Sequence, residues 1–189
     1  MNQDITIRMA NEGDAEEILA IYTPYVLHTA ITFEYTVPTL EEFRERIQKT
    51  LKKFPYLVAI KEGRIVGYAY VSPFKERAAY DWAVETSIYI QEASRESGIG
   101  TKLYLALEAI LKKQNVINLN ACIAYPNPGS IRFHERLGYQ IVAHFTKCGY
   151  KLETWHDMIW MEKMIGEHTI PPQAIIPITE LAWSEVLLK

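Results

Sequence analysis

A glycine-bearing turn in the middle of the chain has the residue types that bind a diphosphate. Residues 95–100 read Arg-Glu-Ser-Gly-Ile-Gly and lie between a predicted strand and a predicted helix. Backbone N–H groups reach an anion only where no side chain intervenes, and a helix N-terminus adds a favourable dipole. The pattern predicts a pyrophosphate cradle, although the two glycines would also suit a turn that binds nothing. The residues assigned to this cradle are Arg95, Glu96, Ser97, Gly98, Ile99, Gly100 and Thr101.

Two other phosphate-binding motifs fit the turn poorly. A P-loop requires Gly-Lys-Ser/Thr, whereas the order here is Gly100-Thr101-Lys102. A dinucleotide-binding turn follows the first strand of a parallel unit, whereas this turn follows the fourth strand of a largely antiparallel pattern. Neither motif therefore accounts for the glycines.

A carboxylate lies in a largely apolar segment just before the turn. Glu85 belongs to the predicted strand 81–90, DWAVETSIYI. Partial burial would raise the pKa of this carboxyl group toward the range useful to a general base. The alternative is an edge carboxylate held in a salt bridge. Strand alternation places Glu85, Ser87 and Tyr89 on one face and Thr86, Ile88 and Ile90 on the other.

The elements that position these residues follow from hydrophobic periodicity and capping patterns. The predicted order is one strand, two helices, three strands, a helix, a strand, a helix and two strands. This order predicts an α+β fold with a mixed, mostly antiparallel sheet flanked by helices. Pro24 should kink or shorten the first helix. The predicted strands are 5–8, 56–60, 64–72, 81–90, 119–124, 139–145 and 154–164, and the helices contain residues 18–26, 43–51, 103–111 and 130–137.

Length and composition limit the classes of protein. The 189 residues, 49% of them hydrophobic, suit one domain with a substantial core. We assign residues 1–164 to this domain and 165–189 to a C-terminal extension of unknown role. The net charge is −3, from 20 basic and 23 acidic residues, and the sequence has no cluster of basic residues that would predict binding to nucleic acid.

Cysteine usage and hydropathy indicate the compartment. Cys122 and Cys148 fit neither a disulfide framework nor paired zinc spacing, so we expect no metal site. The N-terminus lacks the pattern of a secretory signal, and the apolar stretches are too short to span a membrane. We therefore expect a cytoplasmic protein without membrane contacts.

A second motif gives the glycine turn its context. Residues 127–139 follow the pattern N-x-x-S-x-x-F-[Y/H]-x-x-L-G-[F/Y]. Together with the turn at 95–100, this resembles the GCN5-related N-acetyltransferase (GNAT) superfamily. In that superfamily the first motif holds the pyrophosphate of acetyl-CoA and the second flanks its pantetheine and thiol. The resemblance implies the GNAT fold, with acetyl-CoA as co-substrate.

Further residues resemble the phosphinothricin N-acetyltransferase branch. The similarity extends from about residue 7 to residue 164 and implies acetyl transfer to the α-amine of a glutamate-like amino acid, such as phosphinothricin, methionine sulfoximine or methionine sulfone. It also implies a homodimer. Glu96 departs from the small or basic residue usual at its position, and we expect its side chain to point into solvent. The residues that carry this similarity are Tyr22, Thr32, Phe33, Glu34, Ala79, Tyr80, Asp81, Trp82, Val84, Glu85, Tyr89, Trp155, His156 and Asp157.

The resemblance also suggests roles within the reaction. Glu85 would take the proton of the attacking amine, directly or through water, and His134 would protonate the departing thiolate or orient the amine. Direct attack in a ternary complex is preferred, because neither cysteine has a partner that would stabilise a thiolate. Cofactor contacts are expected from the backbone of Ile88, Tyr89 and Ile90 and from Asn127 and Ser130.

Acceptor recognition is expected from a cationic loop and nearby aromatic residues. Lys75 and Arg77 would bind anionic groups, although both also suit a solvated loop. The resemblance adds Phe33, Glu34, Tyr80, Val84 and Thr86 to the acceptor pocket. Trp155 and His156 would close it, and all these aromatic residues would also suit a plain core. Two alternatives are a GNAT enzyme that acetylates a polyamine or an aminoglycoside, and a non-catalytic acyl-CoA sensor.

Overall fold

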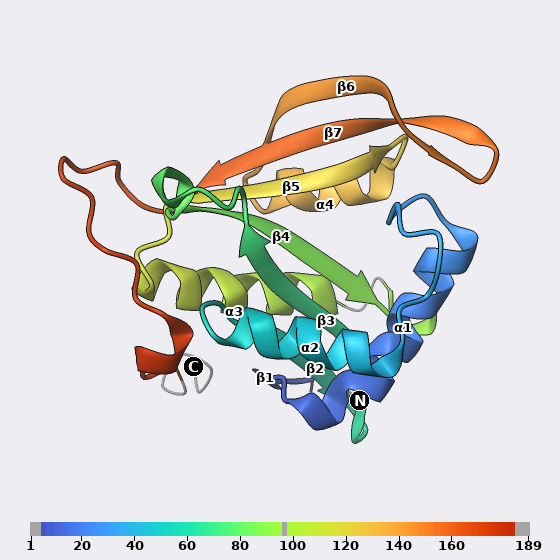
Figure 1. Ribbon diagram of the computed structural model, residues 1–189, viewed down its shortest axis with the longest axis horizontal. Helices are drawn as coiled ribbons and strands as arrows, with labels where there is room; N and C mark the ends of the chain where they lie inside the picture. Colours follow the sequence, from blue (N-terminus) through green and yellow to red (C-terminus); the bar gives the residue numbers. More distant parts are fainter. Residues whose placement is uncertain (1–4, 96–97, 184–189) are drawn as a thin grey trace.

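The centre of the molecule is a seven-stranded sheet with the order β1-β2-β3-β4-β5-β7-β6 (Figure 1). The computed structural model describes residues 5–95 and 98–183. Neighbouring strands are antiparallel except β4 and β5, which are parallel. The strands are β1 (Thr6–Met9), β2 (Tyr56–Lys61), β3 (Arg64–Pro73), β4 (Ala83–Ile90), β5 (Asn118–Tyr125), β6 (Gln140–Lys151) and β7 (Thr154–Met164).

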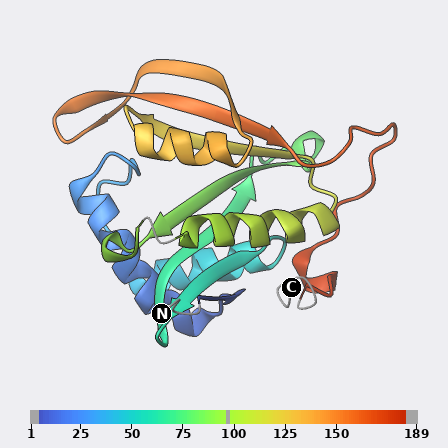
Figure 2. The same ribbon diagram turned by 180° about the vertical axis from the view of Figure 1, so that it is seen from behind.

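Helices cover both faces of this sheet. The first two, α1 (Ala15–His28) and α2 (Leu40–Leu51), lie on one face, whereas α3 (Ile99–Lys113) and α4 (Pro128–Arg136) lie on the other (Figures 1 and 2). Helix α2 begins at a capping box, in which the Glu42 N–H donates to Thr39 Oγ1 at 3.2 Å and Glu42 Oε2 accepts from the Thr39 N–H at 2.7 Å. No helix among the described residues has the length and apolar character needed to cross a membrane.

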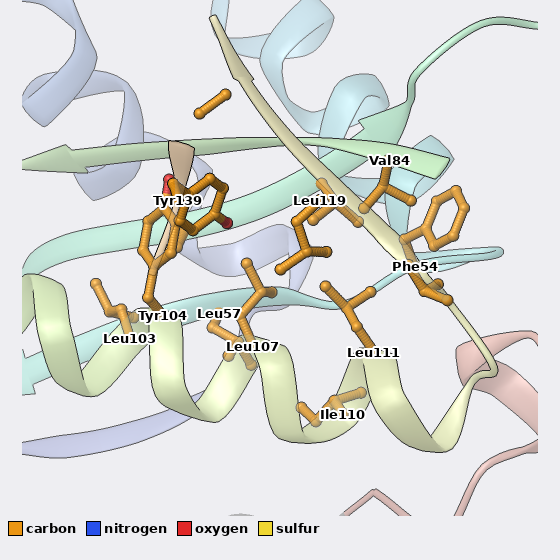
Figure 3. Close-up of a cluster of buried hydrophobic side chains, with 14 of the residues drawn as sticks. Phe54, Leu57, Val84, Leu103, Tyr104, Leu107, Ile110, Leu111, Leu119 and Tyr139 are labelled. Carbon is orange, nitrogen blue, oxygen red and sulfur yellow. The ribbon is translucent and has the colours of Figure 1, made fainter. Parts of the chain in front are cut away.

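The two faces carry separate hydrophobic clusters. Leu103, Leu107 and Leu111 project from α3 toward the sheet, where Figure 3 places them beside Leu57 and Leu119. The second cluster joins α1 and α2 to the opposite face. Both helix pairs are therefore fixed by burial of one apolar stripe, as their periodicity predicts.

The parallel pair β4 and β5 is short. Its register joins Ala83–Glu85 only to Asn118–Asn120. Beyond Glu85 the two strands separate, which is visible in Figure 1 as a widening gap toward the C-terminal ends of both strands. Glu85 therefore lies at the point where the sheet opens.

The α+β class and the order of strands and helices are confirmed, with three local corrections. Helix α1 continues four residues past Pro24, because apolar residues on both sides of the proline are buried and outweigh one lost hydrogen bond. Strand β4 begins at Ala83 rather than Asp81, because Asp81 follows a 3₁₀ turn, Ala78–Tyr80. Strand β6 extends to Lys151 rather than residue 145, through two irregularities in its pairing with β7.

Candidate active site

A cavity of about 570 Å³ lies at the N-terminus of α3, next to the glycine turn. Gly98 has φ +78°, in the left-handed region that favours glycine. No side chain of the described residues caps the helix, so its first N–H groups are available to a ligand. The predicted cradle residues Arg95, Gly98, Ile99, Gly100 and Thr101 all line this cavity, whereas Glu96 and Ser97 lie outside the described residues.

Helix α4 forms the other wall of this cavity. A Cβ at Gly100 would lie 3.1 Å from the Phe133 ring, so a glycine allows the two helices to approach closely. Arg132 and Arg136 also line the cavity, one helical turn apart. These two cations were not among the predicted cofactor contacts, although their i,i+4 spacing is visible in the second motif. They add positive charge where an anionic ligand would lie.

A hollow of about 70 Å³ continues from this cavity between β4 and β5. It is lined by Thr86, Ser87, Ile88 and Tyr89 of β4, by residues 121–124 of β5, and by Tyr104, Asn127, Ser130 and His134. Asn127 and Ser130, which the sequence predicts as cofactor contacts, line both spaces. Asn127 also caps α4, because its Oδ1 accepts from the Ser130 N–H at 3.1 Å.

Three residues of β4, Ile88, Tyr89 and Ile90, are predicted to bind the cofactor through their main chain. Only Ile88 has main-chain groups that are directed at this hollow and have no other partner among the described residues. The Gln91 N–H donates to the Val66 carbonyl, which sets alternate residues of β4 toward β3. The main-chain N–H and C=O of Tyr89 therefore pair with β3, whereas those of Ile88 point toward the hollow. Ile90 also points away from β3, but its N–H and C=O both bind the Tyr25 hydroxyl, at 3.3 and 2.6 Å.

Glu85 lies on the sheet face that α1 and α2 cover. Its alternation partners Ser87 and Tyr89 contact residues of that face, since Ser87 binds the Tyr70 hydroxyl and Tyr89 packs against Tyr22. The Glu85 side chain is half-buried. Burial raises the pKa of its carboxyl group above the ordinary 4.5, and the positive charge of Lys75 partly opposes this increase. The carboxylate is thus a stronger base than an exposed glutamate.

His134 is buried in the wall of the hollow, with 3% of its surface exposed. Its Nδ1 lies 2.8 Å from the Ser130 carbonyl oxygen, which only accepts, so Nδ1 carries the proton. In the neutral ring Nε2 is an acceptor 3.0 Å from the Tyr104 hydroxyl, whose single proton is shared between this nitrogen and Thr86 Oγ1 at 3.2 Å. Burial lowers the pKa of His134 and outweighs the bond to Ser130, so the neutral ring is the form present at pH 7. Both ring nitrogens are occupied.

Two of the predicted acceptor residues are held by other parts of the protein. Phe33 packs so closely on β6 that a Cβ at Gly149 would overlap its ring. Glu34 forms an ion pair with Arg46 at 2.6 Å. Both residues thereby fix the segment between α1 and α2 against its surroundings.

The remaining predicted acceptor residues divide between the core, the groove and the surface. Val84 is fully buried in the cluster beneath α3, so its side chain does not face a pocket. Thr86 lines the hollow and donates to the Asn120 carbonyl at 3.1 Å. Lys75, Arg77 and Tyr80 are exposed on the loop before β4.

The cysteines have no features of an acyl carrier. Cys122 lines the hollow, and burial raises the pKa of its thiol to about 12. A thiol with this pKa is almost entirely protonated at pH 7 and is a weak nucleophile. Cys148 is a free, exposed thiol on β6. Cys122 is therefore poorly suited to carry an acyl group.

Comparison with known proteins decides the family. A model described as an acetyltransferase (GNAT) domain matches residues 7–160. The chain belongs to the GNAT acetyltransferase family. The curated relatives of this acetyltransferase include the phosphinothricin N-acetyltransferase of Streptomyces viridochromogenes, which is 32% identical over 94% of this chain and 96% of the relative. An L-methionine sulfoximine/L-methionine sulfone acetyltransferase of Salmonella typhimurium is 31% identical over 88% of this chain and 98% of the relative.

Solved structures agree with this assignment. The crystal structure of a GNAT superfamily phosphinothricin acetyltransferase from Sinorhizobium meliloti, in complex with acetyl-CoA, matches this acetyltransferase with a TM-score of 0.86 and 31% sequence identity. The match covers 93% of this chain and 97% of that one. The resemblance read from the two motifs is therefore confirmed for the family and the fold.

Proposed function

We propose that this acetyltransferase moves an acetyl group from acetyl-CoA to the α-amine of a glutamate-like amino acid, by direct attack in a ternary complex. The observation that carries the proposal is the position of Glu85, a half-buried carboxylate with a raised pKa where β4 and β5 separate. The hollow begins at Thr86, the next residue of β4, so a thioester bound there would lie close to this carboxylate, and the neighbouring Lys75 suits an anionic acceptor.

Acetyl-CoA is the acyl donor, and the cavity at α3 fits its diphosphate. The uncapped N–H groups of α3 and the side chains of Arg95, Arg132 and Arg136 surround this cavity. Pantetheine would run through the hollow, where the main chain of Ile88 is available to bind its amides as an added strand would. Asn127 and Ser130 extend along the same route.

The chemical step needs a base and an oriented thioester. An α-ammonium group must lose a proton before its nitrogen can attack, and Glu85 accepts that proton. The nitrogen then forms a bond to the carbonyl carbon, the carbon–sulfur bond breaks, and the second proton that the nitrogen loses passes to the thiolate, directly or through water, so that coenzyme A leaves as the free thiol. We assign an orienting role to His134, because its neutral Nε2 accepts from the Tyr104 hydroxyl and fixes that group in the wall of the hollow.

The acceptor enters from the face of the sheet that carries Glu85. A second cavity, of about 500 Å³, lies on this face between α2 and β3. Its lining includes Ser72, which is paired with Glu85 in register, and Tyr70, which is paired with Ser87. Lys49 supplies positive charge in this lining, whereas Arg46 is paired with Glu34 and Glu76 adds a carboxylate. The charge of Lys49, together with Lys75 and Arg77 on the loop, favours an amino acid with an anionic head over a polyamine.

A homodimer in the cytoplasm completes the proposal. Strand β6 is the last strand of the sheet, and its outer edge has no partner among the described residues. Ile141, Val142 and Phe145 on this strand are each at least half exposed, at 50%, 55% and 51%. An open edge beside exposed apolar side chains is a feature of protein interfaces.

Initial-rate kinetics would test the proposal. The purified enzyme is incubated with acetyl-CoA and each acceptor, and the release of free thiol is followed. Phosphinothricin, methionine sulfoximine and methionine sulfone should release thiol, whereas spermidine and an aminoglycoside should not. Intersecting double-reciprocal lines should report a ternary complex. Absence of turnover with all three amino acids would refute the proposed acceptor class, and parallel lines would refute direct attack.

A further inference from the structure

The segment after β7 returns across the molecule and joins its core. Residues 165–183, here called the C-terminal segment, run from the end of β7 past the end of α3, as the red chain in Figures 1 and 2 shows. Ile178 is 4% exposed and belongs to the cluster beneath α3, with Ile175, Leu181 and Trp183 packed against it. The segment lies beyond the matched family region, which ends at residue 160.

A buried glutamine joins this segment to the ends of α2 and α3. The Gln114 side-chain amide donates to the carbonyl oxygens of Ile176 at 2.7 Å and Lys53 at 2.8 Å. The Ile176 N–H donates back to the Gln114 carbonyl at 3.1 Å, and the Ile178 N–H donates to the Lys53 carbonyl at 3.0 Å. The main chain of Lys53 is therefore fixed in part by the C-terminal segment.

The same segment holds the last two residues of the loop between β3 and β4. We call residues 74–82 the acceptor loop, because it carries Lys75 and Arg77. The Trp82 indole N–H donates to the Gln173 carbonyl at 2.7 Å. Lys53, whose main chain is bound to Ile178, forms an ion pair with Asp81 through its side chain at 2.7 Å. One contact is direct and the other passes through Lys53.

The base of the acceptor loop has main-chain bonds of its own, since the Ile117 and Asn118 N–H groups donate to the Trp82 carbonyl at 2.9 and 3.0 Å, so the contacts with the segment act on the side chains of Trp82 and Asp81. The Phe74 N–H donates to the Ala83 carbonyl at 3.1 Å and closes the loop, and Lys75 Nζ lies 4.9 Å from the centre of the Phe74 ring. A hollow of about 230 Å³ lies between Tyr80 and Trp82 on one side and His168, Thr169 and Pro172 on the other. Such a hollow leaves the loop room to shift if its contacts with the segment are lost.

We propose that the C-terminal segment is a positioning element for acceptor binding, which holds Trp82 and Asp81 and thereby places Lys75 and Arg77 relative to Glu85. The inference rests on the proposed function, because it assumes that these two cations bind the acceptor. The segment touches neither the glycine turn nor α4 in any contact of the described residues, so acetyl-CoA binding should not depend on it. Trp82 is accordingly a positioning residue.

A pair of conservative variants tests this role. Trp82→Phe removes the indole donor to Gln173 and keeps an aromatic ring. Asn115→Ala is the matched control, since it removes an amide donor to the neighbouring Ala174 carbonyl at 2.7 Å at a residue that follows α3 and lies outside the loop. Its melting temperature is measured as well, because Asn115 has φ +66°, which alanine disfavours. Trp82→Phe should raise the KM for the acceptor about 3- to 10-fold, as loss of one hydrogen bond allows. The KM for acetyl-CoA should stay within 2-fold, and Asn115→Ala should change neither constant.

Amide hydrogen exchange gives a readout that needs no acceptor. Peptides covering residues 74–82 should exchange faster in Trp82→Phe than in the wild type or in Asn115→Ala. An unchanged acceptor KM in Trp82→Phe, an equal increase in Asn115→Ala, or unchanged exchange would each overturn the inference. If exchange is faster in Trp82→Phe but the wild-type enzyme acetylates none of the tested amino acids, the proposed acceptor class is refuted. The inference that the segment holds the loop is then still supported.

Discussion

At the scale of single residues, the account depends on how the surroundings of one carboxylate set its basicity. Strand alternation alone predicted the face on which Glu85 lies, together with Ser87 and Tyr89. The engagement of Ile90 could not be predicted, because the Tyr25 hydroxyl comes from a helix 65 residues earlier in the chain. Local patterns specify which way a side chain points, but not which distant group arrives there.

The charge of Lys75 should control the pH dependence of the reaction. Deprotonated Glu85 is the active base, so kcat/KM should rise with pH through the Glu85 pKa, which burial places above 4.5. Lys75 stabilises the carboxylate and lowers this pKa. Lys75→Gln should therefore move the acid limb of the profile to higher pH.

Arg77→Gln is the control for this shift, because it removes a cation from the same loop without a contact to Glu85. It should leave the acid limb in place. The measurement is kcat/KM for the acceptor across pH, at saturating acetyl-CoA. If the acid limb of the pH profile does not move in Lys75→Gln, Lys75 does not affect the pKa of the catalytic base.

At the scale of elements, the helices and the central strands followed from capping and periodicity, whereas edges and irregular segments did not. Helix α2 begins directly after the capping box of Thr39 and Glu42, a pattern that is local in the sequence. The extension of β6 to Lys151 was missed, because its sequence after residue 145 lacks alternation and the strand continues only through pairing with β7. Edge strands are defined by their partner as much as by their own residues.

The glycine turn permits a matched test of the anion cradle. Gly98 and Gly63 have φ of +78° and +77°, and a Cβ at either would meet no atom within 4 Å. Valine at either position should cost about 1–2 kcal/mol of stability, because of the left-handed conformation. Only Gly98→Val should also raise the KM for acetyl-CoA, since Gly98 lines the cavity. Equal effects of both variants on this KM would exclude the cradle.

The close contact between Gly149 and Phe33 should affect binding of the acceptor. A methyl group at Gly149 must displace the Phe33 ring, at a cost of about 1–3 kcal/mol for overpacking. We expect Gly149→Ala to lower the melting temperature and to raise the acceptor KM, with the acetyl-CoA KM preserved.

Gly166→Ala is the comparison for this variant, because its nearest contact would be an ordinary 3.6 Å. It should change neither the melting temperature nor the kinetic constants appreciably. An acceptor KM that stays constant in Gly149→Ala would show that the segment carrying Phe33 does not shape the pocket.

At the scale of the whole molecule, the family and fold could be predicted from two motifs in the right order. The packing of the C-terminal segment could not, because its prolines and scattered apolar residues have no periodicity. Its position is specified by main-chain carbonyl groups that accept from Gln114 and Trp82. Every residue has such a carbonyl, so the sequence does not show which of them bind.

The exposed residues of β6 predict the state of association. Sedimentation velocity should give a mass of about twice the 21.8 kDa of one chain. Phe145→Asp should shift the protein to the monomer, because it places a charge among the exposed apolar residues of β6. Ile170→Asp is the control, since Ile170 is 99% exposed outside β6 and should leave the mass unchanged. A wild-type monomer at all concentrations would contradict the proposed dimer.

The most direct test of the central claim is a comparison of Glu85→Gln with the wild type in two measurements on the same samples: kcat for acetyl transfer, and the Kd of acetyl-CoA by calorimetry. Glutamine keeps the shape of the side chain but cannot accept the proton. The account predicts that kcat falls about 10²- to 10⁴-fold, while the Kd is unchanged. A variant that keeps the wild-type kcat would contradict the assignment of Glu85 as the base.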